Sequence, residues 1–285
     1  MTRRRALGVL GAAVAGAAGL LGLRELARTA PDPVVVAGTT RTIDRFADHA
    51  SGEGEWWVPP GATGPLPTVV LVHGGYWRAG FDRTLEDALA ADLAGRGFLV
   101  WNLDYRPSTT AFPTTLTDAA QAYDHLVTGV HADRVDRSRV AVAGHSAGGH
   151  LALWLASRPR LPDGHPVRTP AVVPALCVAQ APVADLVEAH RLGLGGGAVA
   201  ALLDGSPRDH PDRYAVADPA QLAPSGVRTV LVHGVDDSVV PISQSEAYLR
   251  RDPTAQLRRV AGGHFEHLDP RTEAIGALRE ALATL

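Results

Sequence analysis

Three side chains that lie far apart in the sequence have the types and the order that nucleophilic catalysis requires. The first is Ser146, in the stretch GHSAG at residues 144–148, which fits the pattern G-x-S-x-G. An apolar strand-like run precedes this stretch and an apolar helical run follows it, which is the context of a nucleophile elbow. A glycine-rich turn with an ordinary capping serine would give the same letters. We predict that Ser146 is the nucleophile.

A serine hydroxyl is a weak nucleophile and needs a histidine base. The chain has 12 histidines, and His264 follows the last predicted strand near the C-terminus. That position suits the base in the chain order Ser, Asp, His. His267 is the rival, three residues further on. We predict His264, because the loop directly after a strand can reach across the site.

The base in turn needs an acid that orients its ring. The stretch LVHGVDDSVVP offers Asp236 and Asp237 side by side. The spacing of HG, two residues, Asp, two residues and VP selects Asp237, and Asp236 is expected to cap the turn. Asp104 and Asp185 also follow predicted strands. Each is interpreted as a structural hydrogen-bonding group or as a second-choice acid.

These residues need a scaffold, and the sequence predicts one in which strands and helices alternate. The predicted strands are 41–46, 55–60, 68–74, 98–105, 139–146, 175–182, 227–234 and 255–262. The predicted helices are 82–96, 116–130, 147–157, 242–251 and 271–285. This alternation is typical of an α/β fold with a mostly parallel, doubly wound sheet and helices on both faces. Residues 191–226 are interpreted as an irregular crossover, too short for a large cap domain.

Composition excludes several other classes of protein. The formal net charge of −3 gives no basic surface for nucleic acid. Cys177 is the single cysteine, so an intrachain disulfide and a CxxC metal site are excluded, and we interpret it as a buried apolar residue. No metal-ligand pair such as HExxH appears, so no metal and no cofactor are expected. The sequence HGGYW at 73–77 is no phosphate-binding loop, because the chain has no lysine.

The N-terminus has a different character from the rest. Three arginines precede an uncharged run from Ala6 to Leu23. This order resembles a twin-arginine export signal. We therefore predict a signal or membrane-anchor segment at residues 1–30, which would make the protein exported or membrane-anchored, and a single domain at residues 31–285. The alternatives are a cytoplasmic protein or a mis-assigned start.

Together, HGGYW and GHSAGGHLA resemble the α/β-hydrolase fold, in its esterase and kynurenine formamidase (arylformamidase) branch. The resemblance runs from about Thr68 to the C-terminus. It implies an oxyanion hole made by the backbone amides of Gly74, Gly75 and Ala147, in which the amide of Tyr76 can replace one glycine. Related lipases usually carry a third glycine where this chain has Tyr76, which argues against an enzyme of the hormone-sensitive-lipase type.

The resemblance also implies a function. We expect a serine hydrolase that cleaves a carboxylic ester or an amide, such as a formamide, in a small-molecule substrate, through a Ser-Asp-His triad and an acyl-enzyme. Tyr76 and Trp77 are candidates for the substrate pocket, with a buried wall of the core as an equal alternative. The other functions that we consider are a serine exopeptidase of the prolyl-oligopeptidase type and a non-catalytic binding protein with the same fold. The sequence leaves the substrate and the oligomeric state open.

Overall fold

The computed structural model of this chain describes residues 31–285. Its strands are β1 Thr40–Arg45, β2 Glu53–Val58, β3 Leu66–Val72, β4 Leu99–Leu103, β5 Val135–His145, β6 Leu176–Gln180, β7 Arg228–Gly234 and β8 Gln256–Val260. Its helices are α2 Asp87–Gly95, α3 Thr114–Asp124, α4 Ala147–Ala156, α5 Leu186–Arg191, α6 Ala198–Leu203, α7 Pro211–Ala217, α8 Pro219–Leu222, α9 Ser243–Arg251 and α10 Glu273–Leu282. The predicted export or anchor segment lies outside the described residues. Within residues 31–285, no helix has the length and apolar character that crossing a membrane requires.

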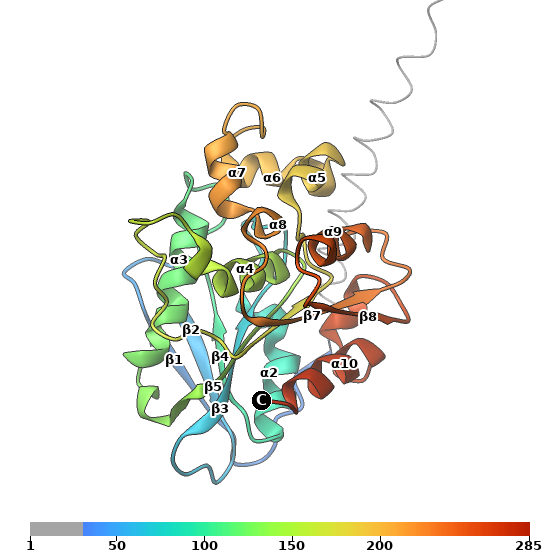
Figure 1. Ribbon diagram of the computed structural model, residues 1–285. Helices are drawn as coiled ribbons and strands as arrows, with labels where there is room; N and C mark the ends of the chain where they lie inside the picture. Colours follow the sequence, from blue (N-terminus) through green and yellow to red (C-terminus); the bar gives the residue numbers. More distant parts are fainter. Residues whose placement is uncertain (1–30) are drawn as a thin grey trace, which may run out of the picture.

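The strands form one sheet of eight in the order β1-β2-β4-β3-β5-β6-β7-β8. The pairs β1/β2 and β2/β4 are antiparallel, and every pair from β4 to β8 is parallel. Figure 1 shows helices on both faces of this sheet. The predicted fold class, a mostly parallel doubly wound sheet of the α/β-hydrolase type, is confirmed.

Each face of the sheet carries its own apolar core. Along β3, Val69 and Leu71 pack with α2 and α10 on one face, whereas Val70 and Val72 pack with α3 and α4 on the other. A strand that is buried on both faces has no polar side to display, which explains the uninterrupted apolar run in the sequence. Cys177 of β6 is a free, buried thiol, as predicted.

The strand order reverses direction at β3. The chain passes from β3 to its neighbour β4 on one side and then crosses to β5 on the other. In an open parallel sheet, ligands bind outside the carboxyl ends of the strands at such a reversal. The stretch HGGYW follows β3, and Ser146 follows β5, so the topology brings these two stretches together at the same end of the sheet.

The crossover between residues 191 and 226 differs from its prediction. It is not irregular, because it contains α6, α7 and α8 and directly follows α5. These helices have four to seven residues each, too few to produce a recognisable apolar period. In Figure 1, α5, α6 and α7 lie together at the top of the molecule, above α4 and α8.

The turn from β5 into α4 approaches β3 so closely that only glycine fits. A Cβ atom on Gly148 would lie 1.9 Å from the carbonyl oxygen of Val72, and one on Gly144 would lie 2.3 Å from the carbonyl oxygen of Gly148. Both contacts are with backbone, which cannot rotate away. The glycines of the G-x-S-x-G pattern are therefore required by packing at this crossing.

This packing predicts opposite effects for two glycine-to-alanine variants. Gly148→Ala should lower the free energy of unfolding by about 2 kcal/mol or more, because its methyl group overlaps backbone. Gly276→Ala, within α10, should raise it by roughly 0.5–1 kcal/mol, because a Cβ there meets no atom within 4 Å and alanine favours a helix. Urea unfolding measures both values. A stable Gly148→Ala variant would contradict the close approach described for the turn.

Candidate active site

Ser146 occupies the sharp turn between β5 and α4. Its φ of 59° and ψ of −117° lie in a region that non-glycine residues seldom adopt. Such a conformation typically costs about 1–3 kcal/mol and persists where its surroundings enforce it. Here the Ser146 amide donates to the carbonyl of Gln180 on β6 at 2.8 Å, and the Ser146 carbonyl accepts from the amide of His150 at 3.0 Å. The predicted strand–turn–helix context of this serine is therefore present.

Asp237 and His264 form a buried hydrogen-bonded pair. His264 Nδ1 lies 2.7 Å from Asp237 Oδ2, and Asp237 Oδ1 accepts from the amides of Val239 and Val240 at 2.8 Å each. Burial by itself raises the pKa of Asp237, but hydrogen bonds from His233, His264 and the backbone outweigh it, so the pKa lies well below its ordinary value. An ionised carboxylate only accepts hydrogen bonds. His264 therefore carries its proton on Nδ1 and leaves the lone pair of Nε2 free.

The atoms that would react are buried and have no partner. Ser146 Oγ and His264 Nε2 both lack a hydrogen-bond partner among residues 31–285. His145, next to the serine, donates from Nε2 to the carbonyl of His264 at 2.8 Å, and the two imidazole rings lie 4.5 Å apart. This contact ties the turn that carries Ser146 to the loop that carries His264.

The loop after β3 has an unusual backbone. Gly75, Tyr76 and Trp77 have consecutive positive φ values of 108°, 52° and 54°. A Cβ on Gly74 would lie 3.3 Å from Cβ of Ser146, so this loop lies directly against the serine. In the described part of the chain, no hydrogen bond uses the amides of Gly75, Tyr76 or Ala147. Unpaired amides beside a serine hydroxyl are suited to bind an oxyanion.

The side chains of Tyr76 and Trp77 are buried. The Tyr76 hydroxyl donates to the carbonyl of Val239, in the loop that holds Asp237, at 3.2 Å. Trp77 packs edge-on against His150, with the ring centres 5.0 Å apart. Both rings thus belong to the packed interior beside the site, and their role as walls of a substrate pocket stays a prediction.

The rival residues have other partners. His267 lies against Gln180, with 3.3 Å between His267 Nδ1 and Gln180 Nε2, and burial lowers its pKa to about 3. Asp104 is paired with Arg83, and Asp185 caps the first turn of α5. Asp236 is exposed in the same loop as Asp237. The structure brings Asp237, and none of the alternative acids, into hydrogen-bond contact with His264.

Two further histidines hold the loops beside the site. His233 ends a strand just before a glycine, which favours bonding to loop backbone, and the structure shows such a bond. His233 donates from Nε2 to the carbonyl of Val240 at 2.9 Å, accepts from the Ser245 hydroxyl at 2.7 Å, and has Nε2 3.4 Å from Asp237 Oδ2. It therefore holds the ends of the acid loop together. The contact of His145 with the loop that carries His264 was not predicted. The position of His145 directly before Ser146 was the available signal for it.

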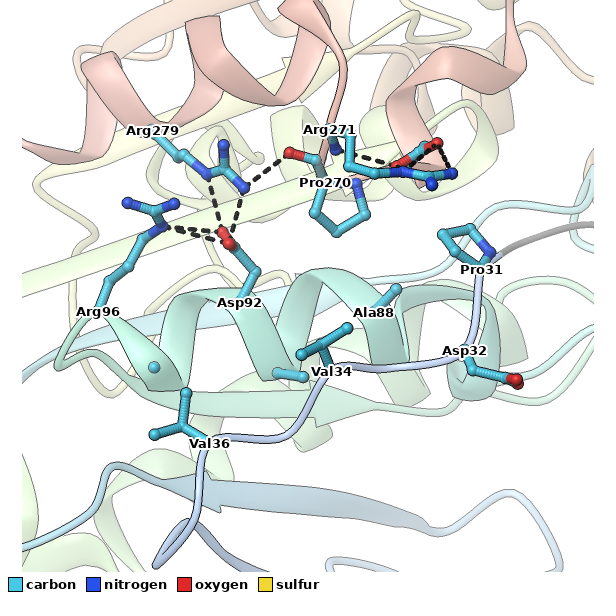
Figure 2. A pocket seen from close by; sticks show the side chains of 13 residues that line it. Pro31, Asp32, Val34, Val36, Ala88, Asp92, Arg96, Pro270, Arg271 and Arg279 are labelled. Atoms are coloured by element: carbon cyan, nitrogen blue, oxygen red, sulfur yellow. Dashed lines mark hydrogen bonds and ion pairs between the residues drawn. The ribbon is translucent and has the colours of Figure 1, made fainter.

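A cavity of about 660 Å³ lies apart from all these residues. It is bounded by α2, the segment 31–36 and the chain before and within α10 (Figure 2). The arginines around it are already paired, Arg279 with Asp92 and Arg271 with Asp269, at 2.7 Å in each case. Within residues 31–285, no group of three His, Cys, Asp or Glu side chains is placed to hold a metal ion.

Curated relatives of known name match parts of the chain. Esterase LipC of Mycobacterium tuberculosis is 28% identical over 216 residues, which are 73% of this chain and 52% of that protein. Kynurenine formamidase of Drosophila melanogaster is 30% identical over 101 residues, which are 35% of this chain and 32% of that protein. The match therefore spans about half the length of the first relative and a third of the second.

Solved structures show the same fold. Esterase B from Lactobacillus rhamnosis superposes with a TM-score of 0.76 at 21% identity, covering 99% of this chain and 95% of that one. A carbohydrate esterase from gut microbiota gives a TM-score of 0.73 at 20% identity, covering 88% and 98%. The family model described as BD-FAE matches residues 55–251, which is more than half of the chain and includes both Ser146 and Asp237. With its α/β-hydrolase sheet and this match, the chain belongs to the BD-FAE family.

Proposed function

We propose that this protein is a serine hydrolase that cleaves a carboxylic ester through a Ser146-Asp237-His264 triad and an acyl-enzyme. One observation carries the proposal. In the His264–Asp237 pair, at 2.7 Å, His264 Nε2 has no partner among residues 31–285, and His145 ties the loop of His264 to the turn of Ser146. A free imidazole nitrogen near an unpaired serine hydroxyl is the arrangement that general-base activation needs.

In the first half of the reaction, Ser146 Oγ attacks the carbonyl carbon of the ester. His264 Nε2 takes the hydroxyl proton, and the imidazolium that forms is stabilised by the ionised carboxylate of Asp237. The tetrahedral intermediate collapses, and His264 gives its proton to the departing alcohol. The acyl group is then bonded to Ser146 Oγ.

The negative charge of the tetrahedral intermediate needs donors that are already in place. Among residues 31–285, three amides beside Ser146 are unpaired: that of Ala147, at the start of α4, and those of Gly75 and Tyr76, in the loop after β3. Loss of one such donor typically lowers kcat about 10²–10³-fold. We assign the oxyanion hole to Ala147 together with the loop at residues 74–76.

In the second half, water attacks the acyl-enzyme. His264 Nε2 takes a proton from the water as the bond to the carbonyl carbon forms, and returns it to Ser146 Oγ as the ester bond breaks. The acid product leaves, and the serine and the neutral imidazole are restored. Each step uses the same fixed tautomer of His264, which Asp237 maintains.

The names of the relatives support an ester substrate and keep a formamide as the second candidate. LipC is named an esterase, and the Drosophila relative is named a kynurenine formamidase. An amide differs from an ester at the leaving group, which His264 must protonate as it departs. The same residues therefore support both reactions, and the substrate decides which one is efficient.

Ser146→Ala should abolish turnover of p-nitrophenyl acetate while the protein stays folded, because the variant has no hydroxyl at position 146 to attack the ester and carry the acyl group. Ser138→Ala is the matched control, since Ser138 is exposed and bonds to Asp136. Turnover by spectrophotometry and labelling with a fluorophosphonate probe measure the effect. Undiminished turnover in Ser146→Ala would refute the nucleophile assignment.

Asp237→Asn should lower kcat about 10⁴-fold, because a neutral amide neither stabilises the imidazolium nor holds the Nδ1–H tautomer. Asp236→Asn, one residue earlier and exposed, should leave kcat unchanged. Steady-state kinetics on the same ester compare the two variants. Equal losses would mean that the loop, rather than the carboxylate of Asp237, is what catalysis needs.

A comparison of three substrates separates the candidate reactions. We expect kcat/KM for p-nitrophenyl acetate to exceed that for N-formylkynurenine, and an aminoacyl amide to be the poorest of the three, because the alcohol is the best leaving group. The enzyme without substitutions is assayed on all three at one pH. Faster turnover of N-formylkynurenine would make the formamidase the better assignment.

A further inference from the structure

The two atoms that the proposed reaction needs are closed off from solvent. Ser146 Oγ and His264 Nε2 are both buried and unpartnered in the described chain. An ester must reach both atoms at once, so some segment has to lie over the path that it takes. The crossover after β6 supplies a segment suited to this role.

This segment is residues 193–197, between α5 and α6, which we call the glycine strap. Gly193, Gly195, Gly196 and Gly197 have positive φ values of 65°, 59°, 63° and 87°. Leu194, the one residue of the strap with a side chain beyond Cα, packs against the main core. Leu194 is thus the one residue of the strap that packs through its own side chain, and the other four residues offer only backbone.

The glycine strap rests directly on Tyr76. A Cβ on Gly195 would lie 2.7–2.8 Å from the ring carbons of Tyr76, so the bare backbone of Gly195 packs against the tyrosine ring. The guanidinium of Arg78 donates to the carbonyl of Gly195 and holds the strap there. Both contacts come from the loop after β3, whose amides we assign to the oxyanion hole.

Tyr76 connects the glycine strap to the loop that carries Asp237. Its hydroxyl donates to the carbonyl of Val239 at 3.2 Å, and the amide of Val239 donates to Asp237 at 2.8 Å. The ring therefore spans the distance between the strap and the acid loop.

We propose that Gly195 determines the size of the ester that this site accepts, by allowing the glycine strap to close directly on Tyr76. This inference rests on the proposed ester hydrolysis. A small acyl or alcohol group fits beneath the closed strap, whereas a larger one must displace it. A side chain at position 195 would prevent the close contact and leave the site more open. Arg78 favours the closed position of the strap, as Gly195 does, because its guanidinium donates a hydrogen bond to the Gly195 carbonyl.

The chain offers a matched pair of variants for the test. Gly195→Ala places a methyl group against the Tyr76 ring, whereas Gly193→Ala has a similar φ, 65° against 59°, but meets no atom within 4 Å. Both variants place alanine at a similar positive φ and so carry similar backbone strain. Only Gly195→Ala pushes the strap away from the Tyr76 ring. The ratio of kcat/KM for p-nitrophenyl octanoate to that for the acetate should rise about fivefold or more in Gly195→Ala and stay at the wild-type value in Gly193→Ala.

A second variant keeps the test decisive if Gly195→Ala does not fold. Arg78→Gln removes the guanidinium that holds the Gly195 carbonyl, and should raise the same ratio. An unchanged ratio in both variants, or an equal loss on both esters, would overturn the inference while leaving the ester hydrolase in place. A wild-type protein with no ester turnover and no fluorophosphonate labelling would instead overturn the proposed function, and this inference with it.

Discussion

The buried negative charge of Asp237 is the interaction on which the rest of the site depends. A carboxylate in the interior is tolerated only when its lone pairs are satisfied, and here the amides of Val239 and Val240 and the ring of His264 satisfy them. The same hydrogen bonds fix the loop after β7 in one conformation. They also settle which nitrogen of His264 carries the proton. The charge of Asp237 thus fixes the conformation of the loop after β7 and the Nδ1–H tautomer of His264, and so leaves the lone pair on His264 Nε2.

The sheet places these parts where they can meet. The loops after β3, β5, β7 and β8 carry the predicted oxyanion amides, Ser146, Asp237 and His264 in that order. They emerge at the same end because β3 to β8 run parallel around the reversal of strand order. Direct contacts then join the loops pairwise, through His145 between the serine and histidine loops and through Tyr76 between the oxyanion and acid loops. Each of these four loops is therefore hydrogen-bonded to another loop of the site.

Local residue patterns were sufficient to predict the sheet and to select candidates for the site. Ser146 could be selected as a candidate because an elbow requires glycines in fixed places. Asp237 could be selected because the spacing between HG and VP in its loop matches a known pattern. The helices between residues 186 and 222 could not be found, since elements this short leave no periodicity. The contact of Gly195 with Tyr76 could not be predicted either, because the two residues are 119 positions apart in the sequence. Local patterns carry no information on such tertiary contacts. The backbone of Tyr76 and Trp77 could not be predicted either. Both have positive φ, a conformation that residues with a side chain disfavour.

The state of Cys177 has a practical consequence for following motion in this protein. It is the single cysteine of the chain, and it lies inside the sheet on β6, between β5 and β7. A thiol-reactive probe therefore meets no accessible natural thiol in the folded state. A cysteine introduced at an exposed position such as Leu192, next to the glycine strap, would be labelled alone. Fluorescence or spin-label measurements of motion near the glycine strap would therefore need no prior removal of a native cysteine.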